Sequence, residues 1–463
     1  MTTTVWVLGD QLHRDIGALG DAQPGRERVV VLESIAKLRS RPWHRQRAHL
    51  IVTALRRFVA ELRAEGFDVD HRVAPTFRSG LEAHRTAFRP DRVLATEPNS
   101  WAAMKLLGEL EVTTVRSNQF LCHRDEFVGR ARDRHLKMED FYRWQRRRLG
   151  YLMDGDEPAG GRWNFDHDNR EPPPRDGRAW PRVLRDELDD LDRQVLAELP
   201  DTCWGEGPDG TWATSRQGAL RRMHHAVHEV LPRFGPHEDA MLSSSWQMAH
   251  TLLSPYLNLG LLLPGEVCDE VEAAHRRGEI PIASAEGFVR QVIGWREYVW
   301  GRYWQWMPGY RDANELAATR PLPPAFTGAP THMNCVHQVM TTLHEHGWAH
   351  HIQRLMVLGN LGLTAGVDPR AMTEWMWASF VDGAEWVMLP NVIGMALHAD
   401  GGRMATKPYA SGGAYIDRMS DYCSGCRYDR RRRTGDDACP FTTLYWDVLD
   451  RLHDRFLRNA RVA

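Results

Sequence analysis

The sequence predicts an α/β domain with a doubly wound parallel sheet, followed by a larger all-α domain. Strand-like and helix-like segments alternate over the first 120 residues, glycines and prolines interrupt residues 150–200, and helical periodicity runs from Thr214 nearly to the end. A chain of 463 residues is also too long for one ordinary core. We therefore expect an α/β domain over residues 1–120, a linker over 121–205 and an all-helical domain over 206–463.

Five segments of the N-terminal domain look like buried strands. They are Val5–Leu8, Val29–Leu32, Val69–Val73, Val93–Thr96 and Thr113–Val115, and the helices between them are predicted at Trp43–Glu65, Leu81–Phe88 and Trp101–Leu110. This βαβ order indicates a parallel sheet with helices on both faces, in which ligands bind beyond the carboxyl ends of the strands. Gly9-Asp10-Gln11-Leu12 directly follows the first strand and is therefore in a binding position. The three-glycine dinucleotide fingerprint is absent, so the domain is not an obvious NAD site.

The rest of the chain reads as an interrupted segment and then helices. The segment Trp163-Asn-Phe-Asp-His-Asp-Asn-Arg170 is too aromatic for an idle linker. Beyond it, helices are predicted at Arg216–Leu231, Pro264–Arg277, Glu286–Trp306, Val336–Gly347 and Tyr445–Asn459. The basic run Arg430–Arg433 is interpreted as a solvated face rather than a nucleic-acid arm.

Composition limits the class of protein. Hydrophobic content of 42% and charged content of 26% are those of a globular protein, and the apolar runs are too short to cross a bilayer. No signal-peptide pattern opens the chain, so we expect a cytoplasmic protein. A formal charge of −2 argues against a histone-like nucleic-acid binder but allows a local basic groove.

The most specific local pattern is a group of cysteines near the C-terminus. Two residues separate Cys423 from Cys426, twelve separate Cys426 from Cys439, and Pro440 follows. This spacing favours a metal site, and zinc and an iron–sulfur cluster both satisfy it. Zinc requires a fourth ligand, from Cys335 or a histidine.

Several motifs of the helical region together resemble the flavin-binding domain of photolyases and cryptochromes. They are Phe234-Gly-Pro-His-Glu-Asp-Ala240, the segment from His250 to Gly260, Gly294-Trp-Arg-Glu-Tyr298, Gly347-Trp-Ala-His-His-Ile-Gln-Arg354 and the segment from Asp382 to Asn391. With Lys407-Pro-Tyr-Ala410 and the cysteine tail, the resemblance narrows to the bacterial iron–sulfur photolyases, also called prokaryotic (6-4) photolyases. It covers nearly the whole chain.

The resemblance implies three cofactors and the residues that bind them. It assigns Thr251, Leu253, Ser254, Trp295, Arg354, Asp382 and Asn391 to FAD, with Trp375 as the first electron donor to the flavin. It assigns a 4Fe–4S cluster to Cys335, Cys423, Cys426 and Cys439. The antenna pigment of this branch is 6,7-dimethyl-8-ribityllumazine, for which Gly9, Asp10, Gln11 and Glu33 are the candidate contacts. From the residues alone, Thr251 and Ser254 suit helix capping equally well.

His350 and His351 resemble the double-histidine motif of (6-4) photolyases. The implied activity is light-driven repair of (6-4) pyrimidine–pyrimidone photoproducts in ultraviolet-damaged DNA, with the lesion flipped out of the duplex. Returning a hydroxyl or amino group between bases needs a proton donor as well as an electron, and histidine titrates near neutrality. We therefore expect His351 to be the catalytic acid, supported by His350, with Tyr409 and Gln291 as further catalytic residues.

The chain departs from its relatives at three positions. Leu355 stands where animal (6-4) enzymes have another histidine, and Met376 stands where relatives have a tyrosine after the donor tryptophan. Gln291 lies four residues before Trp295 rather than three. Two alternative functions stay open: a cryptochrome-like blue-light photoreceptor without repair, and a cyclobutane pyrimidine dimer photolyase. We expect a monomer that acts on DNA and has no membrane partner.

Overall fold

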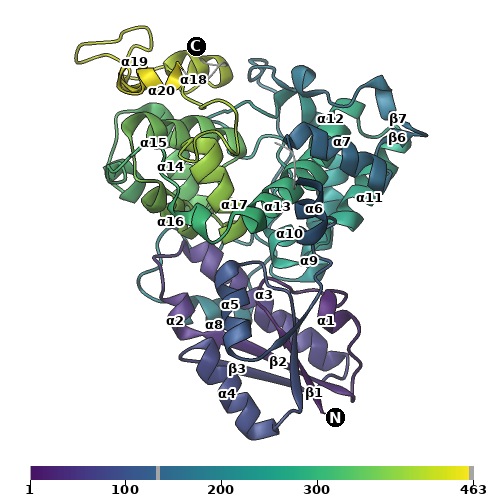
Figure 1. The fold of residues 1–463 in the computed structure, drawn as a ribbon. Helices are drawn as coiled ribbons and strands as arrows, with labels where there is room; N and C mark the ends of the chain where they lie inside the picture. Colours follow the sequence, from purple (N-terminus) through teal and green to yellow (C-terminus); the bar gives the residue numbers. More distant parts are fainter. Residues whose placement is uncertain (1, 132–135, 458–463) are drawn as a thin grey trace. The chain divides into compact units, whose positions relative to one another are not determined.

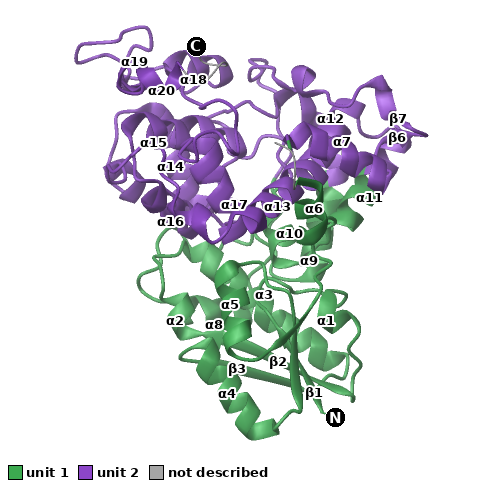
Figure 2. Cartoon of the chain, viewed as in Figure 1, with its two compact units in different colours: residues 1–136, 183–226, 252–271 green, residues 137–182, 227–251, 272–463 purple. Residues whose placement is uncertain are grey.

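The computed structural model describes residues 2–131 and 136–457. Contacts divide the chain into two compact units, each built from non-contiguous segments (Figure 2). The first unit contains residues 1–136, 183–226 and 252–271, and the second contains residues 137–182, 227–251 and 272–463. These units differ from the contiguous domains expected from the sequence, because residues 206–226 and 252–271 pack with the sheet and the expected linker is shared between both units. The assignment of antenna and flavin roles to them stays a prediction.

The first unit contains a five-stranded parallel sheet (Figure 1). Its strands are β1 (Thr3–Val7), β2 (Glu27–Ser34), β3 (Val69–Ala74), β4 (Arg92–Thr96) and β5 (Thr113–Val115). Their order is β3-β2-β1-β4-β5, and every pairing is parallel. The predicted doubly wound sheet and its five strands are therefore confirmed. The direction of strand addition reverses between β1 and β4, which creates the switch point where such folds bind ligands.

Helices cover this sheet and extend the unit. On one face, Leu81 and Leu107 from two helices pack into a common apolar core with Trp6 and Val30 from the strands. Burying these side chains stabilises each by about 1.5–3 kcal/mol relative to exposure. The helices of the unit are α1 (Gly17–Gly20), α2 (Ile35–Leu38), α3 (Arg45–Ala64), α4 (Phe77–Phe88), α5 (Trp101–Glu109), α6 (Arg124–Ala131), α8 (Asp190–Glu198), α9 (Arg216–His225) and α10 (Ser254–Leu259), and α11 (Pro264–Arg276) crosses its boundary.

Among its described residues, the second unit is helical apart from one short hairpin. The two strands of this hairpin are β6 (Met153–Asp154) and β7 (Glu157–Pro158). Its helices are α7 (Met138–Leu149), α12 (Ile282–Val289), α13 (Glu297–Trp306), α14 (Asn334–His346), α15 (Asn360–Ala365), α16 (Pro369–Ser379), α17 (Glu385–Leu389), α18 (Gly413–Met419), α19 (Pro440–Arg451) and α20 (His453–Phe456). The helix predicted at Tyr445–Asn459 begins earlier, at Pro440, and is interrupted at Leu452; its predicted last two residues lie outside the described residues. In the part of the chain that the structure describes, no helix has the length and apolar character needed to cross a bilayer.

A π-helical stretch at Ala226–Val230 begins at the boundary of this unit, and three others among the described residues lie wholly inside it. These three span Arg290–Arg296, Gln353–Gly359 and Pro390–Ala396. Single π-helical turns cost helix stability and are frequent at functional sites, because the extra residue per turn redirects side chains. Each of these three stretches carries a residue predicted for the site, namely Gln291, Arg354 and Asn391. Arg290–Arg296 lies inside the predicted helix Glu286–Trp306, whose departure from α geometry was not predicted.

Candidate functional site

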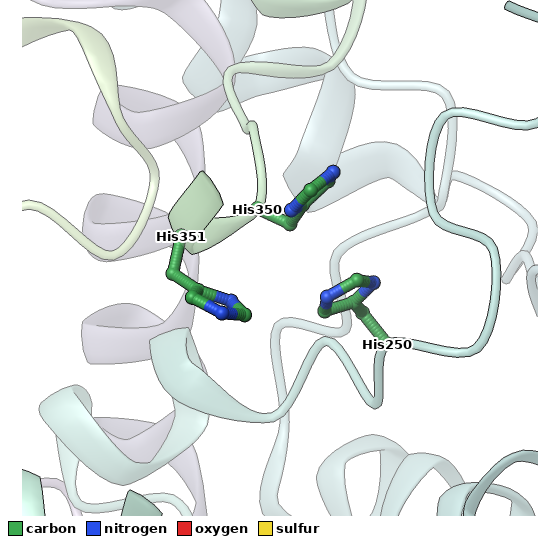
Figure 3. A group of neighbouring side chains, drawn as sticks. All are labelled: His250, His350 and His351. Carbon is green, nitrogen blue, oxygen red and sulfur yellow. The ribbon is translucent and has the colours of Figure 1, made fainter. Parts of the chain in front are cut away.

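Three histidines from two segments lie together in the second unit (Figure 3). His250 precedes α10, whereas His350 and His351 follow the turn that ends α14. Gly347 makes that turn with a φ of 63°, a left-handed conformation that glycine adopts without strain. One ring nitrogen from each histidine lies within 4.8 Å of the others. The two adjacent histidines of the motif therefore share one site with a third.

His250, which is half-buried, and His350, which is buried, form a stacked, uncharged pair. Their rings stack with centroids 4.5 Å apart and planes 19° apart. Burial lowers the pKa of His350 well below its ordinary value, and the neighbouring charges of His250, His351 and Arg354 lower it further. Burial, followed by the charge of His351, lowers the pKa of His250 to about 4. Among the described residues, neither ring nitrogen of His350 has a hydrogen-bond partner.

His351 differs from both in charge and exposure. Its side chain is 48% exposed, and its Nε2 lies 3.1 Å from Asp239 Oδ1. Its partial burial lowers the pKa of His351, but the hydrogen bond to Asp239 and the negative charges of Asp239 and Glu238 outweigh that effect and raise the pKa above its ordinary value. His351 is therefore the imidazole of the three that holds a proton near neutral pH and also reaches solvent.

Three imidazole nitrogens this close are also a potential set of metal ligands. A metal ion binds each imidazole in the plane of its ring, at about 2.0–2.1 Å for zinc. The stacked His250 and His350 rings lie in nearly parallel planes, so an ion between them would be out of plane for both. The geometry therefore favours a site for proton transfer over a metal centre.

Of the other predicted catalytic residues, Gln291 is connected to this cluster through Glu238. Gln291 donates from Nε2 to Oε1 of the buried Glu238 at 2.8 Å. Burial raises the pKa of Glu238 to about 7, against the opposing charges of His351 and Arg290. Tyr409 contacts the ammonium group of Lys407, with 5.8 Å between Nζ and the ring centroid. Tyr409 is thus placed by side-chain packing, and its contact with substrate stays a prediction.

Arg354 and Asp382, both predicted to bind FAD, form an ion pair. The two terminal guanidinium nitrogens donate to the two carboxylate oxygens at 2.9 and 3.1 Å, and the guanidinium carbon lies 4.0 Å from the centroid of the Phe380 ring. A bidentate pair of this kind fixes a cation in one orientation, which fits a group that becomes anionic, such as a reduced flavin. Asn391 instead donates from Nδ2 to the carbonyl of Val387 at 2.9 Å, so its contact with the flavin stays a prediction.

The predicted electron donor, Trp375, lies beside an aromatic ring. It stacks on Phe326 with centroids 4.7 Å apart, and its Nε1 donates to the Phe326 carbonyl at 3.0 Å. Trp295 packs edge-on against Tyr298, with centroids 6.3 Å apart. Phenylalanine is not readily oxidised, so the stacking partner of Trp375 does not itself continue an electron route.

The predicted phosphate-binding segment lies at the start of α10. This helix begins at Ser254, and the residue before it, Leu253, makes no capping hydrogen bond with its side chain. The boundary between the two units falls after Thr251. The role of this segment in binding FAD therefore stays a prediction.

The four cysteines predicted as ligands line one cavity. Cys335 lies in the first turn of α14, Cys423 and Cys426 lie after α18, and Cys439 immediately precedes α19. All four are free thiols. Burial, followed by the charges of the other three sulfurs, raises the pKa of Cys335. Four thiolates around one cavity would repel one another without a cation, so this donor set fits a metal or iron–sulfur cluster.

Three polar side chains lie close together at the switch point of the sheet in the first unit. Asp10 follows β1, Asn99 follows β4 and Gln119 follows β5. Asn99 Nδ2 donates to Asp10 at 3.1 Å and to Gln119 at 2.7 Å, and burial raises the pKa of Asp10. Gly9 and Asp10 are partly exposed there, as a ligand contact requires. Asn99 and Gln119 were not predicted, although the strand order locates the loops that carry them.

The other two residues predicted for the antenna pigment are bound within the protein. Gln11 is buried and donates to the Glu97 carbonyl at 2.8 Å. Glu33 accepts two hydrogen bonds from Arg56, at 2.8 and 2.9 Å, and lies 2.8 Å from His71. Their part in pigment binding stays a prediction.

Comparison with known proteins establishes the family. A (6-4) photolyase of Agrobacterium fabrum is 40% identical over 485 aligned residues, which cover 100% of this chain and 94% of that protein. The chain belongs to the (6-4) photolyase family of enzymes.

The model of the deoxyribodipyrimidine photo-lyase-related protein family matches residues 5–205. The crystal structure of a bacterial class III photolyase from Agrobacterium tumefaciens has the same fold, with a TM-score of 0.63, 16% identity, and coverage of 98% of this chain and 97% of that chain. An uncharacterised protein of Acanthamoeba polyphaga mimivirus is 28% identical over 107 residues, 23% of this chain and 80% of that protein.

The site of this photolyase includes three residues to which the sequence assigned no role. Asp239 binds His351, Glu238 binds Gln291, and His250 stacks on His350. All three lie inside the segments that resemble the photolyase family. The presence of two consecutive acids and a histidine in those segments could have indicated a function. Only the packing of the chain, however, shows which side chains these three residues contact.

Proposed function

We propose that this photolyase repairs (6-4) photoproducts in ultraviolet-damaged DNA under light, with His351 as the proton donor. The ion pair between His351 and Asp239 is the observation that carries the proposal. It supports a protonated imidazole at neutral pH on a partly exposed side chain, which is what an acid catalyst that meets an incoming base requires. Membership of the (6-4) photolyase family and the whole-length similarity to a (6-4) photolyase supply the substrate class.

The chemistry assigns separate roles to the histidines. In the lesion, a hydroxyl or amino group has moved from one pyrimidine to its neighbour, and the group leaves more easily once it is protonated. His351 donates this proton from its imidazolium, while Asp239 orients the ring and stabilises its charge. The neutral His250 and His350 add no competing positive charge beside the donor. His351 recovers the proton when the group has returned to its original base, so no net proton is consumed.

Three cofactors complete the proposal. Arg354 and Asp382 would hold the flavin ring of FAD, which in its reduced form supplies one electron to the lesion and receives it back. The four clustered cysteines would hold a 4Fe–4S cluster, and the group at Asp10 would contact a lumazine pigment. DNA would bind mainly through its phosphates, so affinity is expected to fall as salt rises.

A repair assay with two variants tests the proposal. The holoenzyme is illuminated with blue light in the presence of an oligonucleotide that carries one (6-4) lesion, and His351→Asn is compared with His337→Asn, an exposed histidine on α14. Loss of a general acid should slow repair by about 10²- to 10⁴-fold, without loss of FAD, whereas His337→Asn should match the wild type. Equal repair by His351→Asn and wild type, or repair only of cyclobutane dimers, refutes the proposal.

A further inference from the structure

We propose that Glu238 is a positioning residue that orients the amide of Gln291, so that Gln291 presents its carbonyl oxygen to the damaged base and reads a hydrogen-bond donor there. This inference rests on the proposed function, because it takes a damaged pyrimidine pair as the substrate. It adds a determinant of substrate recognition that acts through another residue.

The contact between the two side chains fixes the direction of the amide. Gln291 Nε2 donates to Glu238 Oε1 at 2.8 Å. An ionised carboxylate only accepts hydrogen bonds, so the amide must turn its NH₂ group toward Glu238. Gln291 is partly exposed, and its carbonyl oxygen accepts no hydrogen bond from the described residues. The acceptor end is therefore the end left for a ligand.

The second oxygen of Glu238 meets another amide donor. Asn169 Nδ2 donates to Glu238 Oε2 at 3.4 Å and to the Ala283 carbonyl at 3.1 Å, and Asn169 is 2% exposed. Glu238 thus lies between two NH₂ groups. It forms a hydrogen bond with both of them only if each of its two carboxylate oxygens accepts one. A glutamine at position 238 would place its own NH₂ group against one of these donors, so the isosteric replacement cannot reproduce both contacts.

The backbone around Glu238 is shaped for this close approach. A Cβ atom at Gly287 would lie 2.8 Å from Asn169 Nδ2 and 3.2 Å from Glu238 Oε2. Any larger residue at 287 would push the amide and the carboxylate aside. This glycine on α12 therefore keeps Asn169 and Glu238 in place, and it offers a second route to disturb them without removing either side chain.

The charges that face Glu238 come from several elements. Arg290 lies in the same π-helical stretch as Gln291 and donates to Asp166 at 2.8 Å. Arg290 and His351 attract a negative charge at position 238, whereas Asp166 and Asp239 oppose it. Burial outweighs these two cations and raises the pKa of Glu238 to about 7, so above about pH 7 Glu238 is the ionised acceptor that orients Gln291.

The chemistry of the lesion matches an acceptor. A damaged pyrimidine that carries a displaced hydroxyl or amino group offers O–H or N–H donors on its edge. A site built to hydrogen-bond such a group discriminates strongly against bases that lack it, because the polar side chain is then left unpaired. Gln291 with its carbonyl exposed recognises the donor, whereas an amide free to rotate would accept either a donor or an acceptor.

A double-mutant cycle in the dark tests this inference. Binding of the holoenzyme to an oligonucleotide with one (6-4) lesion is compared with binding to the same undamaged sequence for wild type, Glu238→Gln, Gln291→Ala and the double variant. Each single change should weaken binding of the lesion about 5- to 10-fold, the effect of one hydrogen bond, and leave undamaged DNA unaffected. The double variant should bind no more weakly than Gln291→Ala, because Glu238 acts only through that amide.

Additional variants separate positioning from damage to the fold. Gly287→Ala should reproduce the loss of lesion binding, whereas Glu266→Gln, which removes a carboxylate paired with Arg216 in the first unit, should not. Flavin content and the thermal midpoint are measured for each protein. Additive losses in the double variant, or unchanged lesion binding in Glu238→Gln, overturn the inference. The cycle needs neither light nor His351, so a failure of repair would refute the proposed function without changing this result.

Discussion

Glu238 should make the stability of the free enzyme fall as pH rises through neutrality. Burial raises the pKa of this carboxyl from an ordinary value of 4.5 to about 7. Between these two values the folded protein binds more protons than the unfolded chain, so the free energy of unfolding decreases with rising pH. Each pH unit is worth about 1.4 kcal/mol, so the whole interval corresponds to about 3 kcal/mol, lost in full above about pH 7.

The replacement Glu238→Gln removes this dependence. The unmatched NH₂ group beside Asn169 destabilises the variant by an amount that does not change with pH. Because wild type loses stability as pH rises, the free energy of unfolding of the variant relative to wild type should increase by up to about 3 kcal/mol between about pH 5 and about pH 8. Urea unfolding of both holoenzymes across this range measures the difference. Glu266→Gln is a control without pH dependence in this range: burial raises the pKa of Glu266, but the hydrogen bond to Arg216 outweighs it and lowers the pKa below 4.5, so the stabilisation is lost only at more acidic pH and the cost of the replacement should stay constant. A difference between wild type and Glu238→Gln that does not change with pH refutes the reasoning.

Three further outcomes are expected. Asp239→Asn should lower the pKa of His351 and move the alkaline decline of the repair rate to lower pH, which a pH–rate profile measures; an unchanged profile contradicts the role of the ion pair. Cys426→Ser should reduce bound iron and lower the thermal midpoint, as measured by iron content and scanning calorimetry, and full iron content would contradict the proposed ligand set. Trp375→Phe should slow photoreduction of oxidised flavin, measured by absorbance, while repair by chemically reduced enzyme stays at the wild-type rate; unchanged photoreduction would exclude Trp375 as the donor.

The central strands β1 and β2 were predictable because they are mostly buried. Both contain a short apolar run bounded by polar or turn residues, and such runs are typical of parallel sheets. The helices between the strands were located by their periodicity, although α4 begins at Phe77, earlier than predicted. A capping box formed by Thr76 and Ser79 starts that helix, and its polar pattern was missed.

The division into units was not predictable in the same way. Residues 206–226 and 252–271 read as helices like the rest of the C-terminal half, and nothing in their local pattern shows that they pack with the sheet. The unit to which a segment belongs is determined by contacts between residues far apart in the sequence. The π-helical stretches were also not distinguished from ordinary helices. One additional residue per turn leaves the apolar pattern of a helix nearly unchanged.

Within the site, spacing and family motifs located the residues, and tertiary packing determined their charges. The cysteines and the Arg354–Asp382 pair were found from the sequence, and the structure brings each set together. The pairing of Asp239 with His351 spans 112 positions, so no local pattern could predict it. The burial that raises the pKa of Glu238 likewise depends on segments as distant as Asn169 and Gln291.

The resemblance predicts His351 rather than His350 as the acid, and the structure shows how these two adjacent histidines differ. His350 turns into the protein against His250 and loses affinity for a proton, whereas His351 turns toward Asp239 and gains it. Three close imidazoles cannot all be charged, because each positive charge lowers the proton affinity of its neighbours. One carboxylate is therefore enough to place the proton on a single ring. This gives a physical reason why a chain with Leu355 in place of a further histidine can still present one acid: the second partner of the donor is a carboxylate on another segment, not an imidazole one turn along the helix.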